Sequence, residues 1–110
     1  MPDTLQNFKA ELFKALGHPL RIRILELLLH GEKSVSEMQQ ALSVEGSTVS
    51  QQLAILRMKN LVDTRKEGNL IFYRYRDGQV GDLLDVARRI FDSHVVRLRA
   101  LGEEAAQVGW

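Results

Sequence analysis

Two short helices separated by a four-residue break, with a pair of short strands after them, are the feature that most constrains the fold of this chain. Residues 35–42 show an amphipathic helical pattern, residues 43–46 interrupt it, and residues 47–57 resume it. Two further runs follow at 61–66 and 70–75, on either side of a Glu-Gly-Asn turn that suits a tight hairpin. This order predicts a helix-turn-helix followed by a β-hairpin, the arrangement known as a winged helix-turn-helix.

Helical segments on both sides complete the predicted fold. Apolar residues recur at helical spacing over 5–16, and a second helix, which begins with a proline, is expected over 19–30. A last helix is expected over 79–101. The chain is therefore expected to be one domain, residues 1–110, that is mainly α with a small β-hairpin and about five helices.

The last predicted helix carries an apolar seam that needs a partner. Its members repeat at alternating spacings of three and four over more than two heptads, which is typical of helices that pair. The seam could fold back on the chain's own core, but pairing with a second copy is favoured because two-fold dimers are the commonest oligomers. The first helix is expected to complete this interface, so that the chain dimerises through its terminal helices. The predicted interface residues are Phe8, Leu12, Leu84, Ala87, Phe91, His94, Leu98 and Leu101.

Positive charge is concentrated in one part of the chain, although the net charge is only +1. Residues 57–76 hold six basic and two acidic side chains. By contrast, residues 1–56 hold five basic and six acidic side chains, and residues 77–110 hold four basic and six acidic side chains. A local excess of Lys and Arg on a hairpin beside a polar helix is the electrostatic pattern of a protein that binds nucleic acid. A solvated hairpin that is basic by coincidence is the alternative.

Hydroxyl and amide side chains crowd the first turns of the helix predicted at 47–57, as in a helix that enters the major groove of DNA. The candidates for direct contact with bases are Ser47, Thr48, Ser50, Gln51 and Gln52. Ser47 could instead cap the helix, and the glutamines, which can offer a donor and an acceptor to adenine, could be ordinary surface residues.

A second set of candidates would contact phosphates or the minor groove. These candidates are Arg57, Lys59, Arg65, Lys66, Asn69 and Arg74. They cannot all face DNA together, because side chains alternate along a strand. Arg65, Lys66 and Asn69 are favoured because they lie nearest the turn, and Arg57 could instead pair with an acidic residue of its own chain. Double-stranded DNA is the expected partner.

Three motifs in fixed order carry a resemblance to a known family. They are Leu-Gly-His-Pro-Leu-Arg-Ile-Arg-Ile-Leu at 16–25, Ser-Thr-Val-Ser-Gln-Gln-Leu-Ala-Ile-Leu-Arg at 47–57, and the hairpin from Leu61-Val62 through Gly68 to Phe72-Tyr73. Together they resemble the ArsR family of dimeric winged-helix repressors over residues 8–100. The resemblance implies a homodimeric transcriptional repressor that binds a pseudo-palindromic operator and is released by an inducer. The inducer's identity is left open.

The sequence departs from the metal sites of that family. Many members carry two cysteines in the segment that corresponds to 32–38, whereas this chain has serines there and no cysteine anywhere. A serine hydroxyl cannot replace a thiolate toward soft metals. A second family site uses Asp-x-His at the start of the last helix, and here that segment is Asp77-Gly78-Gln79. No metal or cofactor is expected, and the alternative is a harder metal bound by Asp77 and His94.

Other function classes find little support in the sequence. No serine hydrolase, zinc protease, phosphate-loop or dinucleotide motif is present, so the chain is not expected to be an enzyme. No apolar run approaches the roughly 18 residues needed to span a bilayer, and no secretory signal opens the chain, so the cytoplasm is the expected location. A winged helix used for protein–protein docking is the alternative from another class, since a fold alone does not define function.

Overall fold

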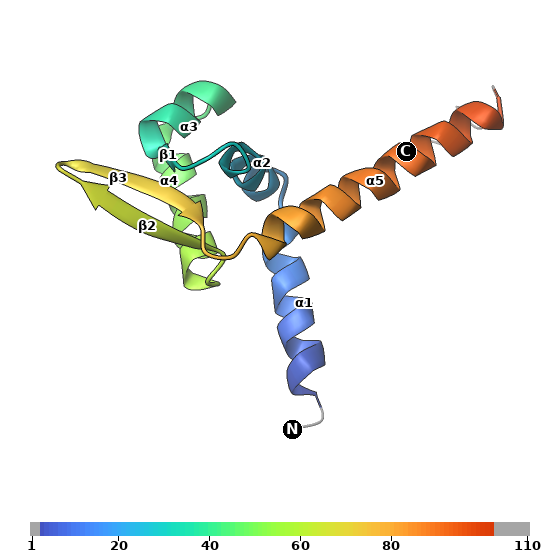
Figure 1. The fold of residues 1–110 in the computed structure, drawn as a ribbon, viewed down its shortest axis with the longest axis horizontal. Helices are drawn as coiled ribbons and strands as arrows, with labels where there is room; N and C mark the ends of the chain where they lie inside the picture. The colour runs from blue at the N-terminus through green and yellow to red at the C-terminus, as the bar shows by residue number, and fades with distance from the viewer. Residues whose placement is uncertain (1–2, 103–110) are drawn as a thin grey trace.

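Five helices and three short strands make up the part of the chain that this computed structural model describes, residues 3–102 (Figure 1). In chain order they are α1 (Thr4–Leu16), α2 (Pro19–Leu28), β1 (Lys33–Ser34), α3 (Val35–Leu42), α4 (Gly46–Met58), β2 (Val62–Glu67), β3 (Leu70–Tyr75) and α5 (Gln79–Ala100). The predicted helix-turn-helix and hairpin are thus confirmed. The short strand β1 is absent from the prediction.

The two helices of the helix-turn-helix begin differently. At the start of α3, the Ser34 hydroxyl accepts from the Glu37 N–H at 3.2 Å, and the Glu37 carboxylate accepts from the Ser34 N–H at 2.9 Å, which forms a capping box. Helix α4 begins at Gly46 after Glu45, and no side chain caps it. The predicted N-cap role of Ser47 is wrong, because Ser47 lies inside the first turn.

The strands form one antiparallel sheet in the order β1-β3-β2. Strands β2 and β3 pair along their whole length, and Gly68 at the turn between them has a φ of 60°, which glycine adopts without strain. Strand β1 adds a short third strand, in which Ser34 pairs with Phe72 in the middle of β3. The middle of the hairpin is therefore tied to the start of α3.

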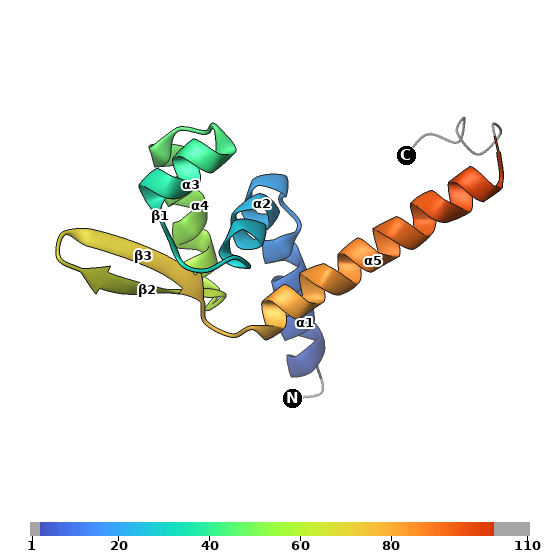
Figure 2. The ribbon, with the colours of Figure 1, turned by 45° about the horizontal axis from the view of Figure 1, so that its top comes forward.

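The core lies where α2, α3 and α4 meet the base of the hairpin (Figure 2). Helices α2 and α4 together supply half of the buried apolar residues in the described part of the chain, because each has an apolar stripe at helical spacing. The largest fully buried side chains are Ile24, Leu25, Met38, Leu53, Leu56, Val49 and Val62. The core therefore covers the inner side of α4, and the other side of α4 faces solvent.

Helices α1 and α5 project from this core in different directions (Figures 1 and 2). The Cα radius of gyration is 16.9 Å, against about 13 Å for a compact domain of this length. Helix α5 spans 22 residues, or about 33 Å, and Gly81 is its one residue buried among those described. No helix in the described residues combines the length and apolar character needed to cross a membrane. Most of α5 therefore has no cover within a single chain.

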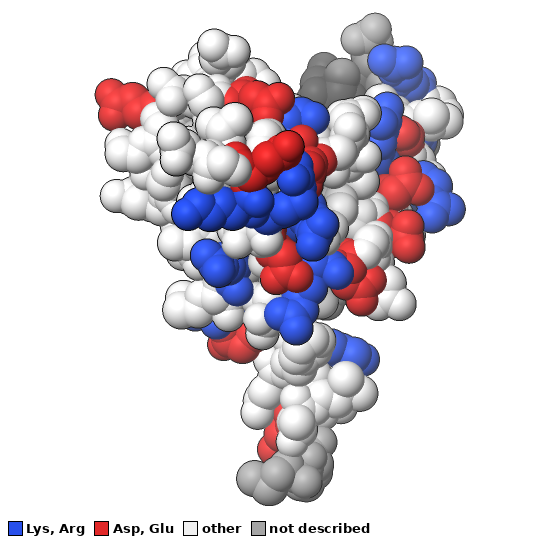
Figure 3. Space-filling model, turned by 60° about the vertical axis from the view of Figure 1, so that its left-hand side comes forward, with Lys and Arg blue, Asp and Glu red and all other residues white. Residues whose placement is uncertain are grey.

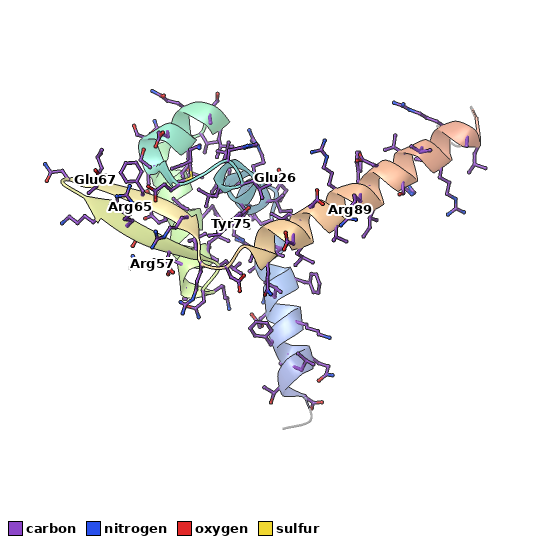
Figure 4. The ribbon with its side chains drawn as sticks, viewed as in Figure 1. Glu26, Arg57, Arg65, Glu67, Tyr75 and Arg89 are labelled. Carbon is purple, nitrogen blue, oxygen red and sulfur yellow. The ribbon has the colours of Figure 1, made fainter. Side chains whose placement is uncertain are left out.

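Tyr75 at the end of β3 joins the hairpin to α2 and lies close to α5. Its hydroxyl donates to the backbone carbonyl of Leu25, and its side chain points toward α2, as Figure 4 shows. A Cβ on Gly81 would lie 3.4 Å from the Tyr75 ring and 2.8 Å from the side chain of Leu29, so a glycine lets α5 approach closely here. Burial, together with the negative charge of Glu26, raises the pKa of the Tyr75 hydroxyl to about 12.

Ionisation of Tyr75 should therefore be delayed in the folded protein. In a Tyr73→Phe variant, which leaves Tyr75 as the one tyrosine, the phenolate absorbance should rise near pH 12, whereas after unfolding in urea it should rise near the ordinary pKa of 10.0. Because the folded pKa is the higher one, the stabilisation from this group is complete below pH 10 and is lost as the pH rises through 12. Identical titrations of the folded and unfolded variant would contradict this placement.

Candidate nucleic-acid interface

Helix α4 presents a polar stripe to solvent on the side opposite the core. Ser47, Ser50 and Gln51 are exposed, whereas Val49 and Leu53 between and beyond them are fully buried. This separation follows from the helical period, which places residues three and four apart on one face. Three of the five residues predicted to contact bases thus share one exposed surface, which we call the α4 stripe: Ser47, Ser50 and Gln51.

The other two predicted base contacts, Thr48 and Gln52, lie on the flank of α4 and are half-buried. The Gln52 side-chain oxygen accepts from the Arg21 guanidinium of α2, with an Nη1–Oε1 distance of 3.0 Å. One side of the Gln52 amide is therefore already occupied within the protein. No sequence pattern predicts this contact, because the two residues lie 31 positions apart.

The register of the hairpin divides its basic residues between two faces. Arg65 pairs with Phe72 and Lys66 with Ile71, so Arg65 and Lys66 point to opposite sides of the sheet. Arg74 lies two residues from Phe72 on β3 and shares the face of Arg65. The predicted alternation is confirmed. Because Arg65 and Arg74 lie on one face of the sheet and Lys66 on the other, at most one of these two faces can lie flat against DNA.

Arg65 is held by acidic groups of its own chain. Its Nε donates to both carboxylate oxygens of Glu32, at 3.0 Å and 3.1 Å, and its Nη1 lies 2.9 Å from Oε2 of Glu67. The guanidinium also stacks on Phe72, with its central carbon 5.0 Å from the centre of the ring. The hydrogen bonds from Arg65 hold the pKa of the Glu32 carboxyl below its ordinary value. Both Arg65 and Glu67 lie on the outer part of the hairpin (Figure 4). Contact between Arg65 and a phosphate would therefore compete with Glu32.

The remaining predicted phosphate contacts are exposed. Lys66 and Asn69 lie at the tip of the hairpin, and Arg57 lies in the last turn of α4. No ion pair joins Arg57 to any residue between 3 and 102, so the pairing considered for it is not found there. Figure 3 shows that Lys and Arg gather over the side of the molecule on which the hairpin lies, with acidic side chains among them.

The surfaces predicted to pair two chains are largely open. Phe8 is 66% exposed and Phe91 is 63% exposed, and Ala87 and Leu101 are exposed as well. Leu12, Leu84, His94 and Leu98 are half-buried. Further large apolar side chains beyond these eight residues are also exposed on α1 and α5: Leu5, Phe13, Val86, Ile90 and Val96.

The residues considered for metal binding lie far apart within one chain. The Asp77 carboxylate accepts from the Gln79 N–H at 2.9 Å at the start of α5, and His94 lies some four turns further on, roughly 20 Å away along the helix. Ser34, at one of the family's thiol positions, is used in the cap of α3. Over residues 3–102 no three His, Cys, Asp or Glu side chains are grouped so that they could hold a metal ion.

A helix-turn-helix with a polar exposed helix, beside a basic hairpin, defines a winged helix-turn-helix transcriptional regulator. The sequence pattern described as "Bacterial regulatory protein, arsR family" matches residues 18–64. The chain belongs to this family of bacterial regulatory proteins.

Relatives of this chain agree with that assignment. It is 43% identical over 89 residues to the uncharacterised HTH-type transcriptional regulator Rv0081 of Mycobacterium tuberculosis, covering 80% of this chain and 78% of the relative. The crystal structure of Rv0081 superposes with a TM-score of 0.77 over 88% of this chain and 97% of that one.

Two further relatives are described in functional or structural terms. The biofilm growth-associated repressor of Xylella fastidiosa is 38% identical over 85 residues, which covers 77% of this chain and 75% of the relative. The solution structure of Mb0332 from Mycobacterium bovis, described as a homodimeric winged helix-turn-helix DNA-binding domain, has a TM-score of 0.75 and 32% identity, covering 82% of this chain and 83% of that one.

Proposed function

We propose that this protein is a homodimeric, single-domain transcriptional repressor that binds a pseudo-palindromic DNA operator. The observation that carries the proposal is the α4 stripe, which exposes Ser47, Ser50 and Gln51 beside a basic hairpin. Hydroxyl and amide groups at this end of a helix suit base edges in the major groove. Arg57, Lys66 and Asn69 are exposed near this stripe or at the hairpin tip and suit the flanking phosphates.

Pairing of two chains through α1 and α5 is the second part of the proposal. An apolar groove of about 440 Å³ lies between α1, α2 and α5 and is open in the single chain. Together with exposed Phe8 and Phe91, it suits cover by a second copy. The M. bovis relative is described as a homodimer, and the X. fastidiosa relative as a repressor. A two-fold dimer would present its two α4 helices to successive major grooves about 34 Å apart.

We further propose that the protein acts on cytoplasmic DNA without metal, cofactor or catalysis. The serines at the family's thiol positions and the cap formed by Ser34 support this proposal. A metal site formed by Asp77 and His94 of different subunits is the competing reading. It predicts that added zinc raises the thermal stability of the protein and weakens its binding to DNA.

The test of the proposed function is a fluorescence-anisotropy titration with DNA from upstream of the protein's own gene. A scrambled duplex is the reference, and both are titrated at several salt concentrations. A preference of about 10³ or more for the native duplex, with a steep salt dependence, is expected. Weak binding that ignores sequence would contradict the proposal and favour a docking module. A reporter gene behind the same DNA should rise when the protein is deleted, and a fall would indicate an activator.

Glu32 is expected to restrain DNA binding by holding Arg65. In a Glu32→Gln variant one of the two carboxylates paired with Arg65 is gone, so the affinities for native and for scrambled DNA should both rise. The slope of log affinity against log salt should steepen by about 0.9 for each subunit, and so by about 1.8 for the dimer, because each added phosphate contact on duplex DNA contributes about 0.9. This slope is measured in the same anisotropy titration.

Two further variants separate this effect from a general change in charge. Glu26→Gln removes the same charge from an exposed position of α2 that does not contact Arg65. It should leave the slope unchanged. In a Glu32→Gln, Arg65→Ala double variant the steepening should disappear. If the double variant kept the steeper slope, Arg65 would not be the group released.

A further inference from the structure

Arg21 of α2 lies at a junction of three helices. Its Nε donates to the Ala15 carbonyl at 2.6 Å, its Nη2 to the Lys14 carbonyl at 3.3 Å, and its Nη1 to the Gln52 side chain at 3.0 Å. One half-buried guanidinium thus joins the end of α1, the start of α2 and the middle of α4. The family match and the DNA-binding proposal assign no role to this residue.

The contact with α1 has a clear physical basis. The last carbonyls of a helix lack partners within the helix, and the partial negative charge there favours a cation. Ala15 and Lys14 belong to the last turn of α1. Arg21 satisfies the Ala15 carbonyl and adds a second donor at the Lys14 carbonyl, which also accepts from the Gly17 N–H at 3.2 Å. The guanidinium is planar and carries its donors in a fixed fork. Once two donors are bound to α1, the direction of the third is fixed as well.

That third donor fixes the orientation of Gln52. A guanidinium can only donate hydrogen bonds, so the oxygen of the Gln52 amide must face Arg21. The amide NH₂ group, which can only donate, is then directed away from Arg21, and the oxygen keeps one further acceptor position. Arg21 therefore occupies one of the two acceptor positions that Gln52 could offer to a base, whereas exposed Gln51 keeps both.

We propose that Arg21 is a positioning residue for DNA recognition. By joining Gln52 to the end of α1, it fixes the angle at which α4 presents the α4 stripe, and it sets the direction of the Gln52 amide. Because α1 also carries exposed Phe8 and Phe13, the same contact connects the face expected to form the dimer with the helix expected to contact bases. This inference rests on the proposed DNA-binding function and adds a residue that determines its specificity.

The experiment compares Arg21→Gln with Arg23→Gln, using the ratio of affinities for native and scrambled DNA. Arg23 lies on the same helix, is exposed, and makes one long hydrogen bond, of 3.5 Å, to the Leu42 carbonyl. Arg23→Gln therefore removes the same charge as Arg21→Gln but leaves the Arg21 contacts in place. The ratio should fall about tenfold in Arg21→Gln, and it should stay within about twofold of wild type in Arg23→Gln. Equal falls in both variants would reduce Arg21 to a general charge and overturn the proposal.

A second variant, Gln52→Met, breaks the contact from the α4 side and leaves the bonds of Arg21 to α1 in place. It should lower the ratio as Arg21→Gln does, and the double variant should show no further fall, because both changes remove one connection. Additive losses would mean that Gln52 acts independently of Arg21. If Arg21→Gln fails to fold, Gln52→Met decides alone, and an unchanged ratio overturns the proposal. Wild-type protein without any preference would instead overturn the proposed function.

Discussion

Replacing Gln51 with alanine should abolish most of the preference for native over scrambled DNA. Gln51 is the one exposed amide in the α4 stripe, and a paired contact between an amide and a base is worth about 1–3 kcal/mol of discrimination. A two-fold dimer uses the residue twice, so the loss should be on the order of 10² or more. Binding to scrambled DNA should hardly change, because the charges that drive it remain.

The matched control for this prediction is Gln40→Ala. Gln40 is exposed on α3, the other helix of the helix-turn-helix, and its side chain makes no hydrogen bond to any of residues 3–102. Both variants are compared by anisotropy on native and scrambled duplexes at one salt concentration. Equal losses on the two duplexes for Gln51→Ala would remove Gln51 from the base contacts. A loss of discrimination in Gln40→Ala would assign the recognition surface to α3 instead.

Replacing Phe91 with glutamate should convert the protein into monomers and lower operator affinity by on the order of 10² or more. A carboxylate in an apolar interface loses its hydration without gaining a partner, which is costly. Once two chains are linked, the second half-site binds at a high effective concentration, and this gain of 10²–10⁴ is lost with the dimer. Sedimentation velocity at micromolar concentration measures the oligomeric state, and anisotropy measures the affinity.

Ser93→Glu is the control for the second prediction. Ser93 is exposed on α5, two residues from Phe91, and therefore lies on nearly the opposite face of the helix. It receives the same new charge but should remain dimeric with unchanged affinity. A dimeric Phe91→Glu variant would contradict the interface proposed for α5, whereas monomers that still bind the operator at full affinity would contradict the coupling of the two half-sites.

The elements that could be predicted are those whose pattern is local. Helix α3, the hairpin and its turn at Gly68 all follow from spacings within a few residues, so their bounds agree closely with the sequence pattern. Strand β1 has only two residues and exists because β3, nearly forty positions away, pairs with it. The start of α4 at Gly46 was missed by one residue because Ser47 has the chemistry of a cap without its position.

The candidate interface could be predicted by residue type but not by contact. The sequence indicates which residues are polar or basic, and the helical period then explains why Ser50 and Gln51 are exposed. It does not reveal that Gln52 is held by Arg21 or that Arg65 is held by Glu32, because these partners lie 31 and 33 positions away. Both contacts depend on how α2 and the segment after it pack against α4 and the hairpin.

One residue, Ser34, belongs to two structures at once, since it pairs with Phe72 in the sheet and caps α3. The register of the sheet and the first turn of α3 are therefore set at the same point of the chain. A residue inserted between 32 and 37 would move either the strand pairing or the cap, whereas one inserted at the exposed tip, 67–70, would only lengthen the hairpin. Variation in chain length among functional descendants of this protein should accordingly collect at the hairpin tip and spare the junction at Ser34.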